Sequence, residues 1–73
     1  MNLKKVRTLI VEDDKETLEY LKKLVRQHNQ LELVAEASDK CMALQKFRLA
    51  QPDLVLLDIE LGQENAFDLL DEI

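Results

Sequence analysis

The sequence has little of several residue types on which whole classes of protein depend. Its 73 residues include one cysteine, one glycine, one proline and no tryptophan. A single cysteine excludes an internal disulfide and fits a reducing compartment. No apolar run approaches the roughly 20 residues that a membrane-spanning helix needs, and the amino-terminal segment lacks the long apolar region of a signal peptide. We therefore expect a cytoplasmic protein with no membrane partner.

Basic residues are fewer than acidic residues. The chain has 10 Lys and Arg against 15 Asp and Glu, which gives a formal net charge of −5. Phosphate contacts require Lys and Arg, so this balance argues against direct binding of nucleic acid by this segment. The sequence also lacks a glycine-rich phosphate loop, a zinc-ligand spacing and a Ser-His-Asp set. Its length allows one domain at most.

The chain alternates between the two periodicities that are typical of strands and helices. Three segments are predicted to be strands: residues 6–11, which are rich in β-branched residues, residues 31–37, where side chains alternate, and residues 54–58, which begin with four apolar residues. Apolar residues at helical spacing predict helices at residues 15–28 and about 39–50. Alternation at this spacing implies parallel strands joined by right-handed crossovers. The predicted fold class is α/β, with a doubly wound parallel sheet of strand order 2-1-3.

Residues between these elements set their limits. Asp14 is expected to cap the first helix, and Ser38 or Asp39 the second, because such side chains accept hydrogen bonds from the first turn. Pro52 ends the second helix because a proline interrupts helical hydrogen bonding. Residues 61–65 are predicted to form a loop.

Spacing also predicts which side chains share a face. In the second strand, Leu31, Leu33 and Ala35 are expected to lie on one face. The outward face of the first helix includes Lys22 and its charged neighbours. The inward face of the second helix is predicted to be one of two sets: Cys41, Leu44 and Phe47, or Ala43, Phe47 and Ala50.

Carboxylates end two of the predicted strands. Glu12, Asp13 and Asp14 follow the first strand, and Asp58 closes the third. In a 2-1-3 sheet these strand ends are neighbours at the point where the strand order reverses, which is where ligands of open α/β sheets bind. Carboxylate oxygens are the ligands that Mg²⁺ prefers. The sequence therefore predicts a Mg²⁺ pocket formed by Glu12, Asp13 and Asp58.

Two motifs resemble those of a known family. Val-Glu-Asp-Asp occupies residues 11–14, and Pro-Asp-Leu-Val-Leu-Leu-Asp-Ile-Glu-Leu occupies residues 52–61. Together they look like the receiver domain of bacterial two-component response regulators, which has a flavodoxin-like fold. The segment at residues 58–61 is similar to that of regulators with a LytTR-type DNA-binding output domain. The resemblance covers the whole chain.

The resemblance implies a role for each acid. Asp58 matches the phosphoryl acceptor, which receives its phosphoryl group from a sensor histidine kinase. Asp13 matches the direct Mg²⁺ ligand, Glu12 matches the acid that holds metal-bound water, and the backbone carbonyl of Glu60 matches the remaining protein ligand. Such a domain is a signalling module and not an enzyme, and in the parent protein it would control a transcriptional output domain.

The sequence also departs from the family pattern. Gly62 and Ala66 stand where the family often has Pro and Gly. A complete receiver has five strands and five helices, and it needs a later Ser or Thr and a later Lys. No Ser or Thr follows Ser38, and no Lys follows Lys46. We therefore expect residues 1–73 to be a partial receiver domain, truncated after the third strand and the start of a third helix near Ala66, and prone to self-association.

Two other functions remain open at this point. One is a Mg²⁺-dependent phosphatase of the haloacid dehalogenase type, which also uses a strand-end Asp, although that family carries its motif after the first strand. The other is a pseudo-receiver, an interaction module without phosphorylation. The missing Thr and Lys favour it for this chain, whereas the intact Glu12, Asp13 and Asp58 argue against it for the parent protein. Each acid also has a structural interpretation as a loop or cap residue.

Overall fold

The structure, a computed structural model, describes residues 4–57, 60–61 and 64–65. Up to the third strand, strands and helices alternate in the predicted order: β1 (Val6–Val11), α1 (Lys15–Gln27), β2 (Leu31–Ala37), α2 (Lys40–Ala50) and β3 (Leu54–Leu57). A pair of two-residue strands follows, β4 (Glu60–Leu61) and β5 (Glu64–Asn65). The predicted boundaries of the first two strands are confirmed.

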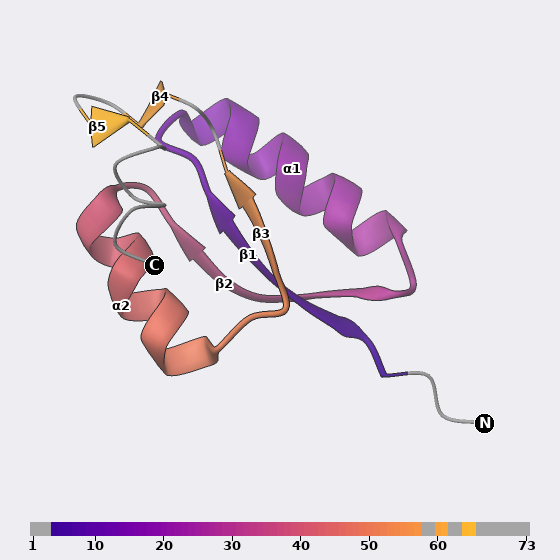
Figure 1. The fold of residues 1–73 in the computed structure, drawn as a ribbon. Coiled ribbons are helices and arrows are strands. Elements are labelled where there is room, and N and C mark those ends of the chain that lie inside the picture. Colours follow the sequence, from indigo (N-terminus) through magenta and orange to yellow (C-terminus); the bar gives the residue numbers. More distant parts are fainter. Residues whose placement is uncertain (1–3, 58–59, 62–63, 66–73) are drawn as a thin grey trace.

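The first three strands form one parallel sheet in the order β2-β1-β3. Helices α1 and α2 lie on opposite sides of this sheet (Figure 1). This arrangement is a doubly wound α/β sheet and confirms the predicted fold class. None of the helices in the described part of the chain is long and apolar enough to cross a membrane.

The core is built on the central strand. Four consecutive residues of β1, from Thr8 to Val11, have no exposed surface. Leu9 and Val11 pack with Ala37 and Ala43 on the side of α2. A strand that is covered by helices on both faces must be apolar on both, which explains why this run shows no alternation. Partly buried side chains surround the cluster: Ala35, Leu44, Phe47, Val55 and Leu57.

The pairing of β1 with β2 is irregular, and it corrects one prediction. Thr8 lies opposite Leu33, but Leu9 lies opposite Ala35, so Val34 is an extra residue in β2. Such a bulge moves the residues beyond it to the other face. Leu33 and Ala35 therefore do not share a face, and Ala35 packs against the core beside Leu9. Apolar alternation alone carries no sign of an inserted residue.

Aspartate side chains begin both helices, as predicted. Asp14 Oδ2 accepts a hydrogen bond from the Thr17 N–H at 2.9 Å, and Asp39 Oδ1 accepts one from the Met42 N–H at 2.8 Å. Each bond satisfies an amide that has no partner within its helix. At the other end of α2, Gln51 adopts a left-handed conformation with φ of 48°.

Two side chains do not lie where their spacing predicted. Cys41 is exposed, and α2 packs against the core through Ala43, Leu44 and Phe47. Cys41 precedes Ala43 by two residues and is therefore about 200° away around the helix. Lys22 was predicted to face solvent, but only 15% of its side chain is exposed. Ala43 and Phe47, which belong to the second of the two predicted inward sets, do face the core. The predicted inward position of Cys41 and the predicted outward position of Lys22 are wrong.

Lys22 forms ion pairs with two carboxylates. Its Nζ lies 3.0 Å from Glu19 Oε2 on α1 and 3.1 Å from Glu36 Oε2 on β2. The hydrogen bonds to Glu19 and Glu36 raise the pKa of Lys22. The long aliphatic stem of Lys lets the ammonium group reach across from the helix to the sheet.

The segment after β3 also differs from the prediction. Residues 61–65 were expected to form a loop, but Glu60 pairs with Asn65 and Leu61 with Glu64 in an antiparallel arrangement. Gly62 and Gln63 separate the two strands in the sequence, and a Gly-X dipeptide is a known hairpin signal. The third helix predicted near Ala66 lies outside the described residues.

Candidate functional site at the carboxyl edge of the sheet

The candidate site lies where β1 and β3 end side by side. The two strands pair in register from Thr8 opposite Leu54 to Val11 opposite Leu57. Glu12 and Asp58 are the next residues in the sequence after Val11 and Leu57. The predicted neighbourhood of the two strand ends is therefore confirmed. Asp58 itself lies outside the described residues.

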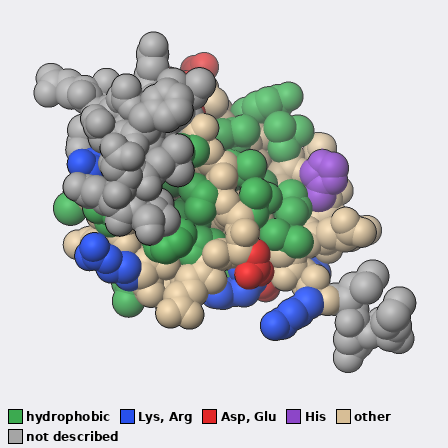
Figure 2. Space-filling model, viewed as in Figure 1, with side chains coloured by type: hydrophobic (Ala, Val, Ile, Leu, Met, Phe, Trp, Pro, Cys, Tyr) green, Lys and Arg blue, Asp and Glu red, His purple; other side chains and the backbone are tan. Residues whose placement is uncertain are grey.

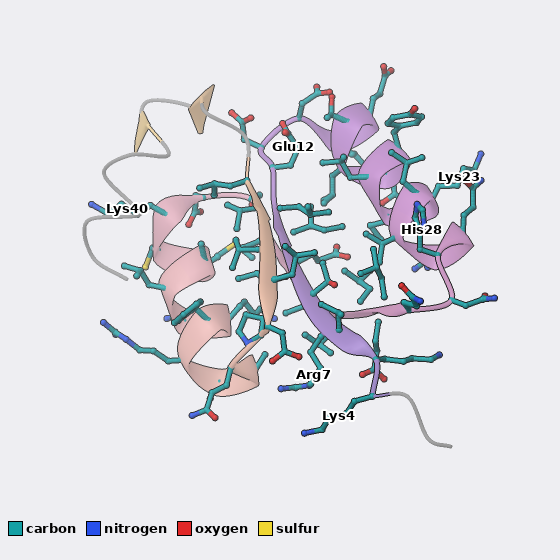
Figure 3. All side chains as sticks on the ribbon, turned by 45° about the vertical axis from the view of Figure 1, so that its right-hand side comes forward. Lys4, Arg7, Glu12, Lys23, His28 and Lys40 are labelled. Carbon is teal, nitrogen blue, oxygen red and sulfur yellow. The ribbon has the colours of Figure 1, made fainter. Side chains whose placement is uncertain are left out.

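Glu12 is held firmly at this edge. It is only 3% exposed, and its N–H donates to the Ala37 carbonyl oxygen at 2.9 Å, which continues the contact between β1 and β2. Its Oε1 accepts a hydrogen bond from the Asp14 N–H at 3.0 Å. Burial of a carboxylate is costly unless hydrogen bonds compensate. Figure 3 shows Glu12 at the turn between β1 and α1.

The two aspartates that follow have different environments. Asp14 Oδ2 accepts hydrogen bonds from the Thr17 hydroxyl at 2.6 Å and from its N–H at 2.9 Å. These two bonds, the first above all, lower the pKa of Asp14. Asp13 is exposed to solvent. The carboxylate of Asp14 therefore belongs to the helix cap, as predicted, whereas that of Asp13 faces solvent at the strand end.

The described residues include only part of the predicted metal site. Glu60 begins β4 and pairs with Asn65. The role of its backbone carbonyl as a metal ligand stays a prediction, and so does the role of Asp58. Among the described residues, no three His, Cys, Asp or Glu side chains lie close enough together to hold a metal ion. The two strand-end carboxylates of Glu12 and Asp13 nevertheless match the oxygen donors that Mg²⁺ prefers.

A hollow of about 470 Å³ lies elsewhere, on the outer side of α1. The described residues that line it all come from this helix: Glu19, Tyr20, Lys23 and Arg26. We therefore place the candidate chemistry at the carboxyl edge of the sheet and not in this hollow.

Comparison with known proteins identifies the family. Residues 8–73 match the response regulator receiver domain. The chain belongs to this family. It is 40% identical over 68 residues, or 93% of its length, to the sensory transduction protein LytT of Enterococcus faecalis. It is also 34% identical over 68 residues, again 93% of its length, to a protein-glutamate methylesterase/protein-glutamine glutaminase of Burkholderia thailandensis.

This receiver sequence spans only part of each relative. It covers 28% of the Enterococcus protein and 19% of the Burkholderia protein. Among solved structures, the signal receiver domain of NarL from Mycobacterium tuberculosis is similar in fold, with a TM-score of 0.84 at 24% identity. That match covers 90% of this chain and 53% of the NarL chain. The likeness supports the receiver fold.

Proposed function

We propose that this chain is the phosphoryl-accepting part of a two-component response regulator and that Asp58 is the acceptor. The observation that carries the proposal is the in-register pairing of β1 and β3, which ends at Val11 and Leu57. The next residues in the sequence are Glu12 and Asp58. In a chain of the receiver family, this arrangement favours one acidic site shared by the two strand ends.

The proposed chemistry is a transfer between two side chains. A carboxylate oxygen of Asp58 attacks the phosphorus atom of a phosphohistidine on a sensor histidine kinase. The P–O bond forms as the P–N bond breaks, the electron pair of that bond stays on the histidine nitrogen, and Asp58 becomes an acyl phosphate. The domain is then a phosphorylated signalling module and not an enzyme with a substrate of its own.

The neighbouring acids are suited to a divalent cation. Asp13 would bind Mg²⁺ directly, together with Asp58 and the backbone carbonyl of Glu60. Glu12, which is buried and accepts the Asp14 N–H, would hold a metal-bound water in a fixed position. When bound, Mg²⁺ neutralises the crowded carboxylates and the oxygens of the phosphoryl group. Phosphoryl transfer depends mainly on such positioning and charge neutralisation.

The proposed partners follow from this chemistry. A sensor histidine kinase supplies the phosphoryl group, and an output domain in the full-length protein receives the signal. The similarity to LytT and the residues at 58–61 favour a DNA-binding output domain of the LytTR type and a role in transcription. The acidic balance of the chain indicates that this segment acts through proteins and not through nucleic acid. We place the protein in the cytoplasm, where such kinases release their signal.

The proposal can be tested by intact mass. The full-length protein is treated with acetyl phosphate and Mg²⁺, and we expect the wild type to gain the mass of one phosphoryl group. Asp58→Asn should gain none, because it removes the attacking carboxylate with little change of shape. Glu32→Gln, which alters an exposed carboxylate on β2, is the matched control and should behave as wild type. Equal labelling of Asp58→Asn refutes the assignment, and an unlabelled wild type would favour the pseudo-receiver.

A further inference from the structure

A second polar cluster lies at the amino end of β1, opposite to the strand-end acids. The Asp53 N–H donates to the Arg7 carbonyl oxygen at 2.7 Å, and the Arg7 N–H donates to Asp53 Oδ2 at 3.0 Å. The Arg7 guanidinium group also donates to the carbonyl oxygens of Ala50 and Gln51, the second at 3.2 Å. Figure 3 shows Arg7 and Glu12 at opposite ends of β1.

These contacts hold the connection between α2 and β3. The last carbonyl groups of a helix have no partner within the helix, and a cation near them is favourable. Arg7 supplies both the donors and the charge. Gln51, which has a φ of 48°, occupies a conformation that is uncommon for a residue other than glycine. Arg7 therefore fixes the connection between α2 and β3 to the central strand β1.

The apolar residues of β3 do not determine their own alignment. All four residues from Leu54 to Leu57 are apolar and partly buried. In a strand that is apolar on both faces, the side-chain pattern does not distinguish one register from another. The observed register pairs Thr8 with Leu54. Arg7 directly precedes Thr8 in β1, and Asp53 directly precedes Leu54, the first residue of β3. The two hydrogen bonds between Arg7 and Asp53 therefore extend this register by one pair of residues.

The alignment matters at the other end of the strand. A slip of β3 by two residues would move its carboxyl end by about 6.6 Å. A slip by one residue would turn every side chain to the opposite face. Mg²⁺ requires its oxygen ligands at about 2.0–2.1 Å. Either slip would remove Asp58, which follows Leu57 in the sequence, from the site proposed with Asp13.

We infer that Arg7 and Asp53 are positioning residues that fix the register of β3 on β1 and thereby align the proposed phosphoryl acceptor with the metal-binding acids. The effect on phosphorylation depends on the proposed function, whereas the effect on register does not. Both residues lie at the amino ends of the paired segments, whereas the proposed acceptor follows the carboxyl end of β3 in the sequence. Their contribution is geometric, and it acts along the length of one strand.

The test compares variants of the full-length protein. Asp53→Ala removes the carboxylate that accepts the Arg7 N–H, whereas Asp53→Asn keeps a side-chain oxygen that can accept it. Glu32→Ala removes an exposed carboxylate from β2 and is the matched control. Backbone nuclear Overhauser contacts between Val11 and Leu57 report the register directly. Mg²⁺ affinity and the rate of phosphoryl incorporation from acetyl phosphate report its consequence.

We expect Asp53→Ala to lose the contacts between Val11 and Leu57 and to accept phosphoryl groups about tenfold to a hundredfold more slowly, as small misplacements of reacting groups do. Asp53→Asn and Glu32→Ala should retain both properties. If Asp53→Ala keeps the contacts and the wild-type rate, the inference is wrong. If the wild type accepts no phosphoryl group, the proposed function fails. The contacts between Val11 and Leu57 then still test whether Asp53 fixes the register.

A second substitution covers the case in which Asp53→Ala does not fold. Arg7→Gln removes the guanidinium group from the end of α2 but keeps a polar side chain of similar reach. Its matched control is Arg48→Gln, which removes a cation from the last turn of α2. We expect Arg7→Gln, but not Arg48→Gln, to weaken the contacts between Val11 and Leu57. Identical contacts in the two variants would overturn the role of Arg7.

Discussion

Asp13 and Asp14 are neighbours in the sequence but differ in what their carboxylates contact. Asp14 accepts two hydrogen bonds from Thr17 at the start of α1, whereas Asp13 is exposed to solvent. Both bonds go to Asp14 Oδ2, and they hold this carboxylate over the first turn of α1. The proposed metal site therefore depends on Asp13 and not on Asp14.

Substitution of each aspartate by asparagine tests this difference. We expect Asp13→Asn to weaken Mg²⁺ binding by about tenfold or more, since even outer-shell changes at metal sites cost that much. Asp14→Asn should bind Mg²⁺ almost as the wild type does, because asparagine is also a good N-cap. Calorimetric titration of Mg²⁺ into the full-length protein measures both. Equal losses, or a larger loss in Asp14→Asn, would contradict the proposed ligand assignment.

The lowered pKa of Asp14 predicts how its contribution to stability depends on pH. The hydrogen bonds from the Thr17 hydroxyl and N–H favour the ionised carboxylate, so the folded-state pKa lies below the ordinary value of 3.8. Linkage requires that the stabilisation is fully present above the unfolded-state pKa and is lost as the pH falls through the folded-state pKa. Asp14→Ala should therefore lower the melting temperature at neutral pH but much less in strong acid.

Thermal melts of wild type and Asp14→Ala across this pH range provide the measurement. Asp14→Ser is the control, because an uncharged hydroxyl can cap the helix without titrating. The difference in melting temperature between wild type and Asp14→Ser should shrink or change sign on acidification, because protonation neutralises the carboxylate of Asp14 but does not affect a serine hydroxyl. If the difference in melting temperature between wild type and Asp14→Ala is the same at every pH, ionisation of Asp14 does not contribute to stability.

Among the elements, the sequence predicts best what depends on local pattern. The run from Val6 to Val11 forms a strand because it is rich in β-branched residues, and α1 begins where Asp14 can cap it. The bulge at Val34 could not be predicted, because an inserted residue leaves the apolar composition of β2 unchanged. The contact between Arg7 and Asp53 joins residues 46 positions apart, and no local pattern encodes it.

Some features of the candidate site could be predicted from the sequence, and others could not. Strand order predicts that the acids after β1 and β3 are neighbours, since this follows from topology alone. The burial of Glu12 and its hydrogen bond to the Asp14 N–H could not be predicted. These depend on how the turn between β1 and α1 folds back over the sheet. The sequence shows that a residue is acidic but not how its charge is solvated.

The bridge from α1 to β2 gives a prediction at the scale of elements. Lys22 contacts both Glu19 and Glu36, whereas its neighbour Lys23 is exposed. Lys22→Gln should therefore lower the melting temperature more than the matched control Lys23→Gln. Because 61% of the Glu19 side chain and 45% of the Glu36 side chain are exposed, the difference should shrink in about 1 M NaCl, where the screening length is about 3 Å. A salt-independent difference would point to packing of the aliphatic stem instead of charge.

At the scale of the whole molecule, the two edges of the parallel sheet are not alike. The edge strand β2 carries Glu32 and Glu36, and charges on edge strands oppose pairing with another chain. The other edge strand, β3, is apolar throughout and only partly buried, and within the described residues it pairs with β1 alone. On the viewed face, hydrophobic side chains gather over β3 and the adjoining side of α1 (Figure 2).

This asymmetry predicts how a polypeptide of these 73 residues behaves when prepared alone. An apolar, uncharged edge strand pairs readily with another chain, and a short chain buries a small fraction of its surface. We expect the polypeptide to self-associate through β3, so that light scattering shows a mass that rises with concentration. Leu54→Lys, which places a charge at the start of β3, should reduce the association. Leu49→Lys should not, because Leu49 is 84% exposed on α2 and is not part of the edge strand. A concentration-independent monomer that unfolds cooperatively in urea, with a stability of roughly 5 kcal/mol or more, would show that β3 needs no further partner.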